Sequence, residues 1–125
     1  MTCFWDGLRQ SLDLHTVSNL DFVHALQTYN TMTLPTNVRW NGQYLQPQLI
    51  IENYNHVQHY DTKNMCNGYD CSTCDPFLLL CTVLFKKNIV HRYNNTVIRY
   101  MLKPEYETLE FKSNKTHFEF VKKYF

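Results

Sequence analysis

Apolar residues recur at helical spacing through the first half of the chain. In residues 3–14, Phe4, Leu8 and Leu12 share one face at intervals of four residues, which predicts an amphipathic helix. A second helix is predicted to begin at Ser18, because a capping side chain with an acidic residue three positions later is typical of a helix start. The apolar residues of this second helix are Leu20, Phe22, Val23, Leu26 and Tyr29.

Two further helices are predicted from the prolines near their starts. Pro47 is expected in the first turn of a third helix, where its missing N–H costs no hydrogen bond. Asp75-Pro76 predicts the start of a fourth helix, as a capping carboxylate followed by proline. Residues 77–87 are apolar nearly all round, so this helix is expected to be buried. Residues 55–74 are polar and lack periodicity, which predicts a long loop.

After residue 88 the apolar spacing changes from helical to alternating, which predicts β-strands. The predicted strands are residues 89–93, 96–100, 108–112 and 116–123. Asn94-Asn95 forms the turn between the first two strands, as in a hairpin. Helices come first and strands last, so we expect an α+β fold in which N-terminal helices pack on a C-terminal, mainly antiparallel sheet. Residues 1–125 are expected to form one domain.

Composition and charge narrow the classes of function. The chain has 125 residues, of which 44% are hydrophobic and 15% aromatic, enough for one well-packed core. Twelve basic against eleven acidic residues argue against a nucleic-acid surface, which needs a basic excess. No apolar run reaches the ~20 residues of a membrane span, and the first residues do not resemble a signal peptide. Five cysteines, an odd number, argue against a disulfide framework and favour a reducing compartment.

Cys3 and His117 are the residues with the chemistry of a nucleophile and its base. Cys3 begins a predicted helix, whose partial positive charge favours a thiolate. His117 begins the last predicted strand, and alternation places it on the same face as Glu119. A carboxylate there can hold one imidazole nitrogen and fix the tautomer. Judged from these residues alone, His117 is more often expected to be an ordinary histidine at the end of a surface strand than a catalytic base.

A second group of candidate residues is rich in sulfur and imidazole. It contains His56, His59, Cys66, Cys71 and Cys74. The CxxC pair of this group can supply two ligands of a structural zinc, with Cys66 as a third and His59 or His56 as a fourth. Free thiols in a loop are the alternative. Cys81 falls inside the apolar helix and is expected to act as a small buried hydrophobe.

The order of these parts resembles the ovarian-tumour (OTU-like) group of papain-like cysteine proteases, viral and nidovirus-type members included. The run CFWDGLRQSL at residues 3–12 looks like the cysteine–aromatic helix start of that family. The run HFEFV at residues 117–121 looks like its catalytic histidine followed by an aromatic residue. Between them, a buried helix, a strand, a hairpin and another strand follow in the same order. In the family an Asp-Gly-x-Cys segment precedes the cysteine, whereas here only Met1 and Thr2 do.

The resemblance implies a thiol protease with Cys3 as nucleophile, His117 as general base and Glu119 as the orienting residue. It implies a substrate that ends in small residues, such as ubiquitin or a ubiquitin-like modifier, or a cleavage site in a viral polyprotein. Trp5 and Phe118 are then expected to wall a narrow substrate tunnel.

The same resemblance implies action in the host cytoplasm as part of a larger viral polyprotein, with no membrane or nucleic-acid partner. Catalysis of this kind requires no cofactor, while nidovirus relatives with a zinc finger favour a structural zinc. The alternative function is a non-catalytic, zinc-binding interaction module of a viral protein. In that case the ligands would be Cys66, Cys71, Cys74 and His59.

Overall fold

The computed structural model describes residues 2–32, 37–66 and 71–125, with the backbone alone at 66 and 71–73. Its α-helices are α1 (Cys3–Ser11), α2 (Asn19–Tyr29), α3 (Pro47–Gln58) and α4 (Cys71–Phe85), and a 3₁₀ helix, η2, spans Thr62–Cys66. Its strands are β1 (Arg39–Trp40), β2 (Gln43–Tyr44), β3 (Asn88–Tyr93), β4 (Thr96–Met101), β5 (Thr108–Ser113) and β6 (Phe118–Tyr124).

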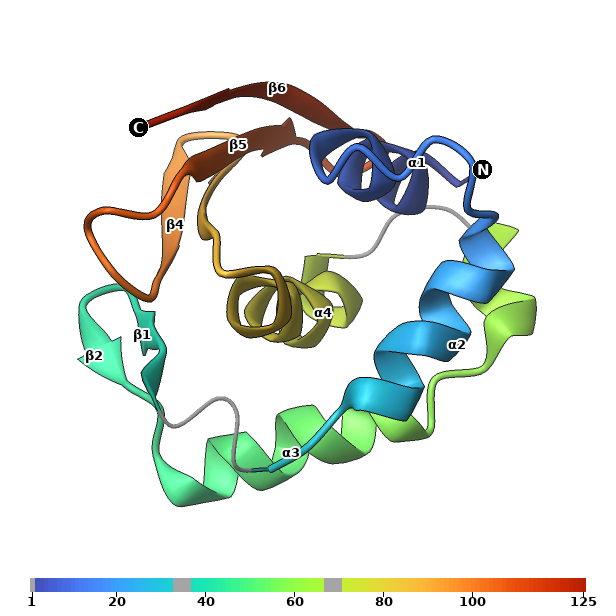
Figure 1. Cartoon of the computed structure of the whole chain (residues 1–125), viewed down its shortest axis with the longest axis horizontal. Coiled ribbons are helices and arrows are strands. Elements are labelled where there is room, and N and C mark those ends of the chain that lie inside the picture. Colours follow the sequence, from blue (N-terminus) through green and yellow to red (C-terminus); the bar gives the residue numbers. More distant parts are fainter. Residues whose placement is uncertain (1, 33–36, 67–70) are drawn as a thin grey trace.

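The six strands form one sheet in the order β2-β1-β4-β3-β5-β6. All neighbours are antiparallel except β3 and β5, which run parallel. The helices gather on one side of the sheet, with α4 in the middle and α2 and α3 beyond it, while α1 lies beside β6 (Figure 1). The expected α+β class and the mainly antiparallel sheet are confirmed.

Helix α4 is the centre of the hydrophobic core, as its apolar sequence predicts. Phe77, Leu78, Leu79, Leu80 and Cys81 are all buried. Burying a large aliphatic or aromatic side chain contributes roughly 1.5–3 kcal/mol, so these five consecutive residues anchor the fold. Around them pack buried residues from α1, α2 and the sheet.

The predicted start of α4 at Asp75 is wrong, because the helix begins at Cys71 and contains Pro76. The Asp75 carboxylate does not cap the helix but accepts a hydrogen bond from the Tyr100 hydroxyl on β4. Burial raises the pKa of Asp75, and the Tyr100 hydrogen bond opposes that rise. Proline removes only one hydrogen bond inside a helix, and the packing of α4 tolerates that loss.

The predicted loop over residues 55–74 is also shorter than expected. Helix α3 continues to Gln58, and the 3₁₀ helix and the first turn of α4 occupy most of the remainder that the structure describes. The last carbonyls of a helix need partners, and here Gln27 on α2 supplies one. Its Nε2 donates to the carbonyl oxygens of Val57 and Tyr60, each at 3.1 Å. This contact from a distant helix is not visible in the local sequence.

Other local signals are confirmed. The Ser18 hydroxyl accepts a hydrogen bond from the Asp21 N–H at 3.1 Å, which caps α2. Pro47 is the first residue of α3. Asn94 has a φ of 52° in the turn between β3 and β4.

Candidate functional site

Helix α1 and strand β6 lie side by side and run in the same direction. Near their starts, the rings of Phe4 and Phe118 pack edge to face with centroids 4.8 Å apart. Near their ends, Lys123 Nζ lies 2.7 Å from Asp13 Oδ2. A Cβ added to Gly7, in between, would lie 3.4 Å from the Phe118 ring, so the helix backbone closely approaches the strand. We call this contact the α1–β6 seam.

The direction of the seam places the two candidate catalytic residues at the same end. Cys3 directly precedes Phe4, and His117 directly precedes Phe118. Since Phe4 and Phe118 are in contact, the residues that carry the thiol and the imidazole lie at the same end of the seam, although no hydrogen bond joins the two side chains within the described residues. A nucleophile and a base from opposite ends of a sequence can work together only through such packing.

Cys3 is the first residue of α1 and is partly buried, with a free thiol. The N-cap residue Thr2 makes no side-chain cap, and the first helical hydrogen bond joins the Asp6 N–H to the Thr2 carbonyl at 2.9 Å. The N–H groups at a helix start lack partners within the helix and carry partial positive charge. Cys3 therefore lies at the end of α1 where backbone N–H groups lack partners within the helix.

His117 ends the turn between β5 and β6 and is exposed, and β6 begins one residue later at Phe118, two residues after the predicted strand start. The turn is fixed by Asn114, whose Oδ1 accepts hydrogen bonds from the N–H groups of Thr116 and His117 at 2.9 and 3.0 Å. The Asn114 N–H donates in turn to the His117 carbonyl at 3.0 Å. The backbone of His117 is thus held firmly while its imidazole faces solvent.

Glu119 lies two residues after His117, but its carboxylate forms an ion pair with another residue. Its Oε1 is 3.2 Å from Nζ of Lys112, the residue directly opposite on β5. Within the described residues, its carboxylate has no hydrogen bond to His117. The orienting role of Glu119 thus requires it to exchange one partner for another, and it stays a prediction.

Trp5 and Phe118 were expected at the walls of a substrate tunnel, but the structure places both in the core. They are 3% and 1% exposed. Trp5 packs on Phe77 of α4 with ring centroids 4.9 Å apart, and Phe118 packs on Phe111 at 5.0 Å. A buried side chain cannot contact a peptide without moving, so both residues act here by holding α1 between α4 and β6.

The predicted zinc ligands do not form a complete set among the described side chains. Cys74 is 3% exposed within the core, and His59 is exposed with its Nδ1 3.0 Å from the Asn55 carbonyl oxygen. The side chains of Cys66 and Cys71 lie outside the described residues. In the part of the chain that is described, no three His, Cys, Asp or Glu side chains are grouped to hold a metal ion. The zinc site stays a prediction.

A polar network beside Cys3 was missed in the sequence. The Asp6 carboxylate accepts hydrogen bonds from Thr2 Oγ1 at 2.8 Å, from Asn19 Nδ2 at 2.9 Å and from Arg9 Nη2 at 3.3 Å. Arg9 Nε also donates to Asn19 Oδ1 at 2.6 Å, and its Nη1 donates to the Leu14 carbonyl at 3.2 Å. Asn19 is thirteen residues from Asp6, so no local pattern signals the contact.

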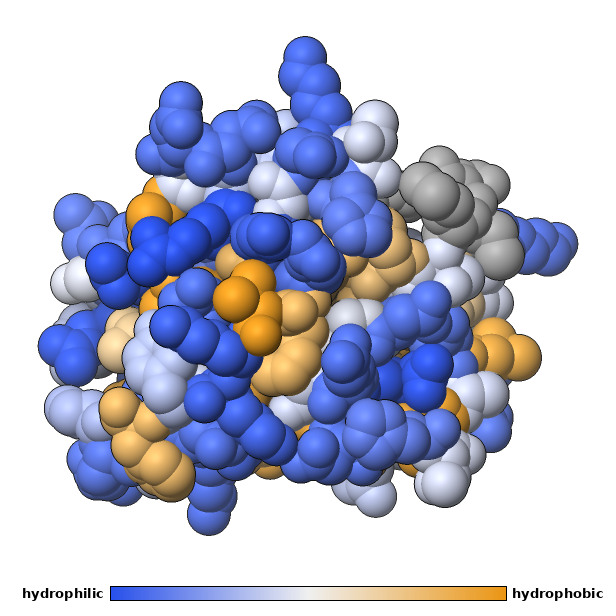
Figure 2. All heavy atoms as spheres, turned by 90° about the horizontal axis from the view of Figure 1, so that it is seen from above, coloured by the Kyte–Doolittle hydropathy of each residue, from blue (hydrophilic) through white to orange (hydrophobic). Residues whose placement is uncertain are grey.

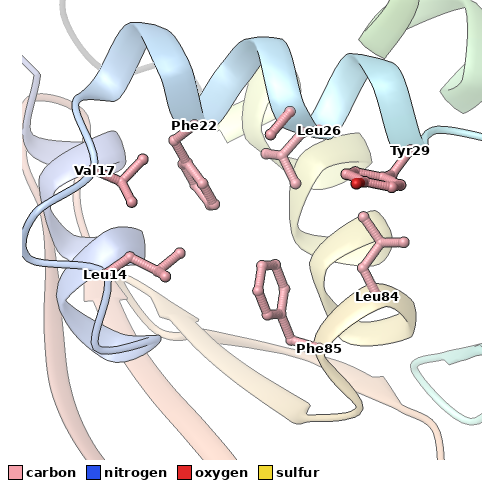
Figure 3. Close-up of a pocket in the computed structure, with 8 residues that line it drawn as sticks. Leu14, Val17, Phe22, Leu26, Tyr29, Leu84 and Phe85 are labelled. Carbon is pink, nitrogen blue, oxygen red and sulfur yellow. The ribbon is translucent and has the colours of Figure 1, made fainter.

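An apolar pocket of about 410 Å³ opens between α2, the end of α4 and the segment after α1 (Figure 3). It is lined by Leu14, Val17, Phe22, Ala25, Leu26, Tyr29, Leu84 and Phe85. None of these is a candidate site residue, and apart from the Tyr29 hydroxyl the lining side chains are hydrocarbon. The pocket therefore offers burial of apolar surface but no group for acid–base chemistry or nucleophilic attack.

The molecular surface is mainly polar on the side of β6 and α1. Figure 2 shows that hydrophilic residues cover most of this face, with hydrophobic residues near its centre and at its edges. Among the described residues, no helix combines the length and apolar character needed to cross a membrane.

Comparison with known proteins gives no match to this chain. No protein-family model fits the sequence, and neither curated proteins nor solved structures show a significant similarity to it. The functional argument therefore rests on the residues and geometry of the α1–β6 seam.

Proposed function

We propose that the chain is a cysteine protease of the OTU-like, papain-like type that cleaves after the small C-terminal residues of ubiquitin or a ubiquitin-like modifier. A viral polyprotein is a further substrate of the same chemistry. The observation that carries the proposal is the parallel alignment of α1 with β6, which brings Cys3 and His117 to one end of the seam. The position of Cys3 at a helix start and the exposed imidazole of His117 add to it.

The proposed reaction is acyl transfer in two steps. His117 takes the thiol proton as Cys3 Sγ attacks the scissile carbonyl, and the new C–S bond forms a tetrahedral intermediate. The Cys3 N–H, at the helix start, is suited to donate to the oxyanion. The C–N bond then breaks, and the amine leaves with the proton from His117. Water then attacks the thioester and gives a proton to His117, the C–S bond breaks, the acid leaves, and His117 returns the proton to Cys3 Sγ.

Hydrolysis of ubiquitin carrying a fluorogenic amide at its C-terminus tests the proposal. We expect the wild-type chain to cleave it, and Cys3→Ala and His117→Ala to lower kcat/KM by on the order of 10³-fold or more. His24→Ala is the control, because His24 is an exposed histidine on α2. Lack of wild-type cleavage, or cleavage that survives Cys3→Ala, contradicts the proposal. Bound zinc together with an inert Cys3 supports the non-catalytic alternative.

A further inference from the structure

The polar network beside Cys3 joins the starts of two helices. Asp6 and Arg9 belong to α1, and Asn19 is the first residue of α2. Arg9 is mostly buried, with 18% of its side chain exposed, and it bridges Asp6, Asn19 and the Leu14 carbonyl. Its guanidinium uses three different nitrogens for these contacts, which fixes its orientation more tightly than a single ion pair would.

The network reaches back to the residue in front of Cys3. Thr2 Oγ1 donates to Asp6 Oδ2, four residues later. A threonine at an N-cap usually accepts a hydrogen bond from the first turn of its helix, but here it makes no such cap. Its hydroxyl donates to Asp6, so the side chain of Thr2 is tied to the next turn of the helix by its proton. The N–H groups of the first turn receive no hydrogen bond from the Thr2 side chain.

Neighbouring hydrogen-bond donors stabilise the negative charge on Asp6. Partial burial pushes the pKa of Asp6 upward, but hydrogen bonds from Asn19, Thr2 and Arg9 together hold that pKa below its usual range. Asp6 is three residues from Cys3 on the helix surface, where a bare carboxylate would oppose a thiolate. The Arg9 guanidinium offsets that charge, and Asn19 donates a hydrogen bond to the carboxylate. The network is thus better suited to positioning the helix start than to activating the thiol.

We propose that Asp6, Asn19 and Arg9 are positioning residues that hold the Thr2–Cys3 peptide, so that the Cys3 N–H stays directed at the oxyanion. This inference rests on the proposed protease function. It gives a role to an aspartate that follows the cysteine in sequence but folds back onto the residue that precedes it. The acidic residue thereby acts on the peptide in front of Cys3 from a position within the helix.

A reciprocal exchange tests the network without changing the net charge. In the double variant Asp6→Asn/Asn19→Asp, Thr2 keeps an acceptor oxygen on residue 6 and Arg9 Nε keeps one on residue 19. The amide then donates to the carboxylate in the opposite direction, and Arg9 Nη2 gives up only its longer contact with residue 6. Each single variant disturbs the pairing: Asn19→Asp places two carboxylates together with no donor between them, and Asp6→Asn leaves one uncharged oxygen where two carboxylate oxygens accepted three hydrogen bonds. We expect each single variant to lower kcat on the fluorogenic ubiquitin amide by on the order of tenfold with KM little changed. The double variant should recover to within about twofold.

A control variant and a second measurement distinguish an effect on the position of the Cys3 N–H from an effect on folding or on activity. Glu105→Gln removes an exposed carboxylate between β4 and β5, outside the seam, and should leave kcat unchanged. The amide ¹H–¹⁵N signal of Cys3 should shift in both single variants and return in the double variant, whether or not the substrate is cleaved. Thermal melts of all variants report folding directly.

The outcomes separate the two claims. Wild-type protein that does not cleave the substrate overturns the proposed function, and the Cys3 amide signal then decides the positioning role alone. An unshifted signal in the single variants, or a folded double variant that stays as slow as they are, overturns the positioning role. A rise in kcat for Asp6→Asn also overturns it, because Asp6 would then act only as an opposing charge.

Discussion

Cys3 and Cys81 both lie on α-helices, yet the two thiols differ in exposure and in their position along the helix. Cys3 is the first residue of α1, partly exposed, with a polar network behind it and His117 at the same end of the seam. Cys81 is inside α4, 1% exposed, and its burial raises the pKa of its thiol. Thiolate character, which makes a cysteine reactive, depends on this environment more than on the residue itself.

The comparison shows that a cysteine at the start of a helix and a cysteine in its interior meet different backbone surroundings. At a helix start, N–H groups without partners stabilise a negative charge, whereas in the interior each N–H is already bonded. Cys74, 3% exposed on the same helix as Cys81, belongs to the packing group. The prediction that Cys81 acts as a small buried hydrophobe is confirmed.

Exchanging sulfur for oxygen at the two positions should separate activity from stability. Cys3→Ser should lower kcat/KM by on the order of 10³-fold while the free energy of unfolding changes by about 0.5 kcal/mol or less. Cys81→Ser should do the reverse, because a buried hydroxyl costs about 1–3 kcal/mol while the site is untouched. Ubiquitin-amide hydrolysis and urea unfolding measure the two effects. Loss of activity in folded Cys81→Ser protein would break the distinction.

The packing half of the comparison extends to Phe118, which joins the seam to the core. It contacts Phe4, Phe111 and His91, with ring centroids 4.8, 5.0 and 5.3 Å away. Phe118→Ala should cost about 3–5 kcal/mol of unfolding free energy, measured in urea, and lower activity with it. Val121→Ala, on the same strand at 42% exposure, should cost about 0.5 kcal/mol. Equal costs for the two variants would contradict the placement of Phe118 in the core.

The buried His91 makes the stability of the core depend on pH. Burial lowers the pKa of His91 from 6.5 to about 4. Above pH 6.5 the ring is neutral in both states, and as the pH falls toward 4 only the unfolded chain takes up the proton. Stability should therefore decline across this window, by about 3 kcal/mol in total from this residue. Urea unfolding at a series of pH values measures the decline.

His91→Gln is the matched variant for this measurement. Glutamine does not titrate, and its amide can keep a hydrogen bond to Ser113 Oγ, which lies 2.6 Å from His91 Nε2. The stability of this variant should depend less on pH between 6.5 and 4 than that of the wild type. Identical pH profiles would show that His91 is not the buried neutral group described here.

Gly7 tests the close approach of the seam itself. A Cβ there would lie 3.4 Å from two Phe118 ring carbons and from the Phe120 nitrogen. Gly7→Ala should stay within about 0.5 kcal/mol of the wild type, because the gain in helix propensity offsets the crowding. Gly7→Leu should cost about 1–3 kcal/mol and lower activity by moving α1 away from β6. Thermal unfolding and hydrolysis report both, and a fully active Gly7→Leu would weaken the role of the seam.

Elements with strong local signals were predictable from the sequence. The cap at Ser18, the proline at position 47 and the turn at Asn94 act within a few residues, and the structure contains each of them. The start of α4 was not predictable in this way. Asp75-Pro76 carries a local start signal, but Tyr100, 25 residues away, takes the carboxylate as its partner.

The parallel pairing of β3 and β5 also depends on contacts that are distant in the sequence. The buried Asn88 donates through Nδ2 to the Lys103 and Tyr106 carbonyls at 2.6 and 3.3 Å, and its Oδ1 accepts from the Leu102 N–H at 2.7 Å. These bonds hold the segment after β4 next to Asn88, the first residue of β3. The chain thereby crosses the start of β3, and β5 pairs with β3 on the side opposite β4. In the sequence Asn88 shows only as a break between two patterns.

The candidate site also contains residues that the sequence indicated and contacts that only the structure reveals. The family resemblance pointed to Cys3 and His117, and the packing of Phe4 on Phe118 accounts for their shared end of the seam. Neither composition nor spacing could show that Asp6 is held by Asn19, since that contact depends on how α2 meets α1.

Labelling with ubiquitin that carries an electrophile at its C-terminus tests the central claim most directly. The modified residue is located by mass spectrometry in wild type and in His117→Ala. We predict a single adduct on Cys3, formed much more slowly in His117→Ala, with Cys74 and Cys81 unmodified because both are buried. No adduct on Cys3 in folded protein, or an adduct whose rate does not depend on His117, would contradict the account.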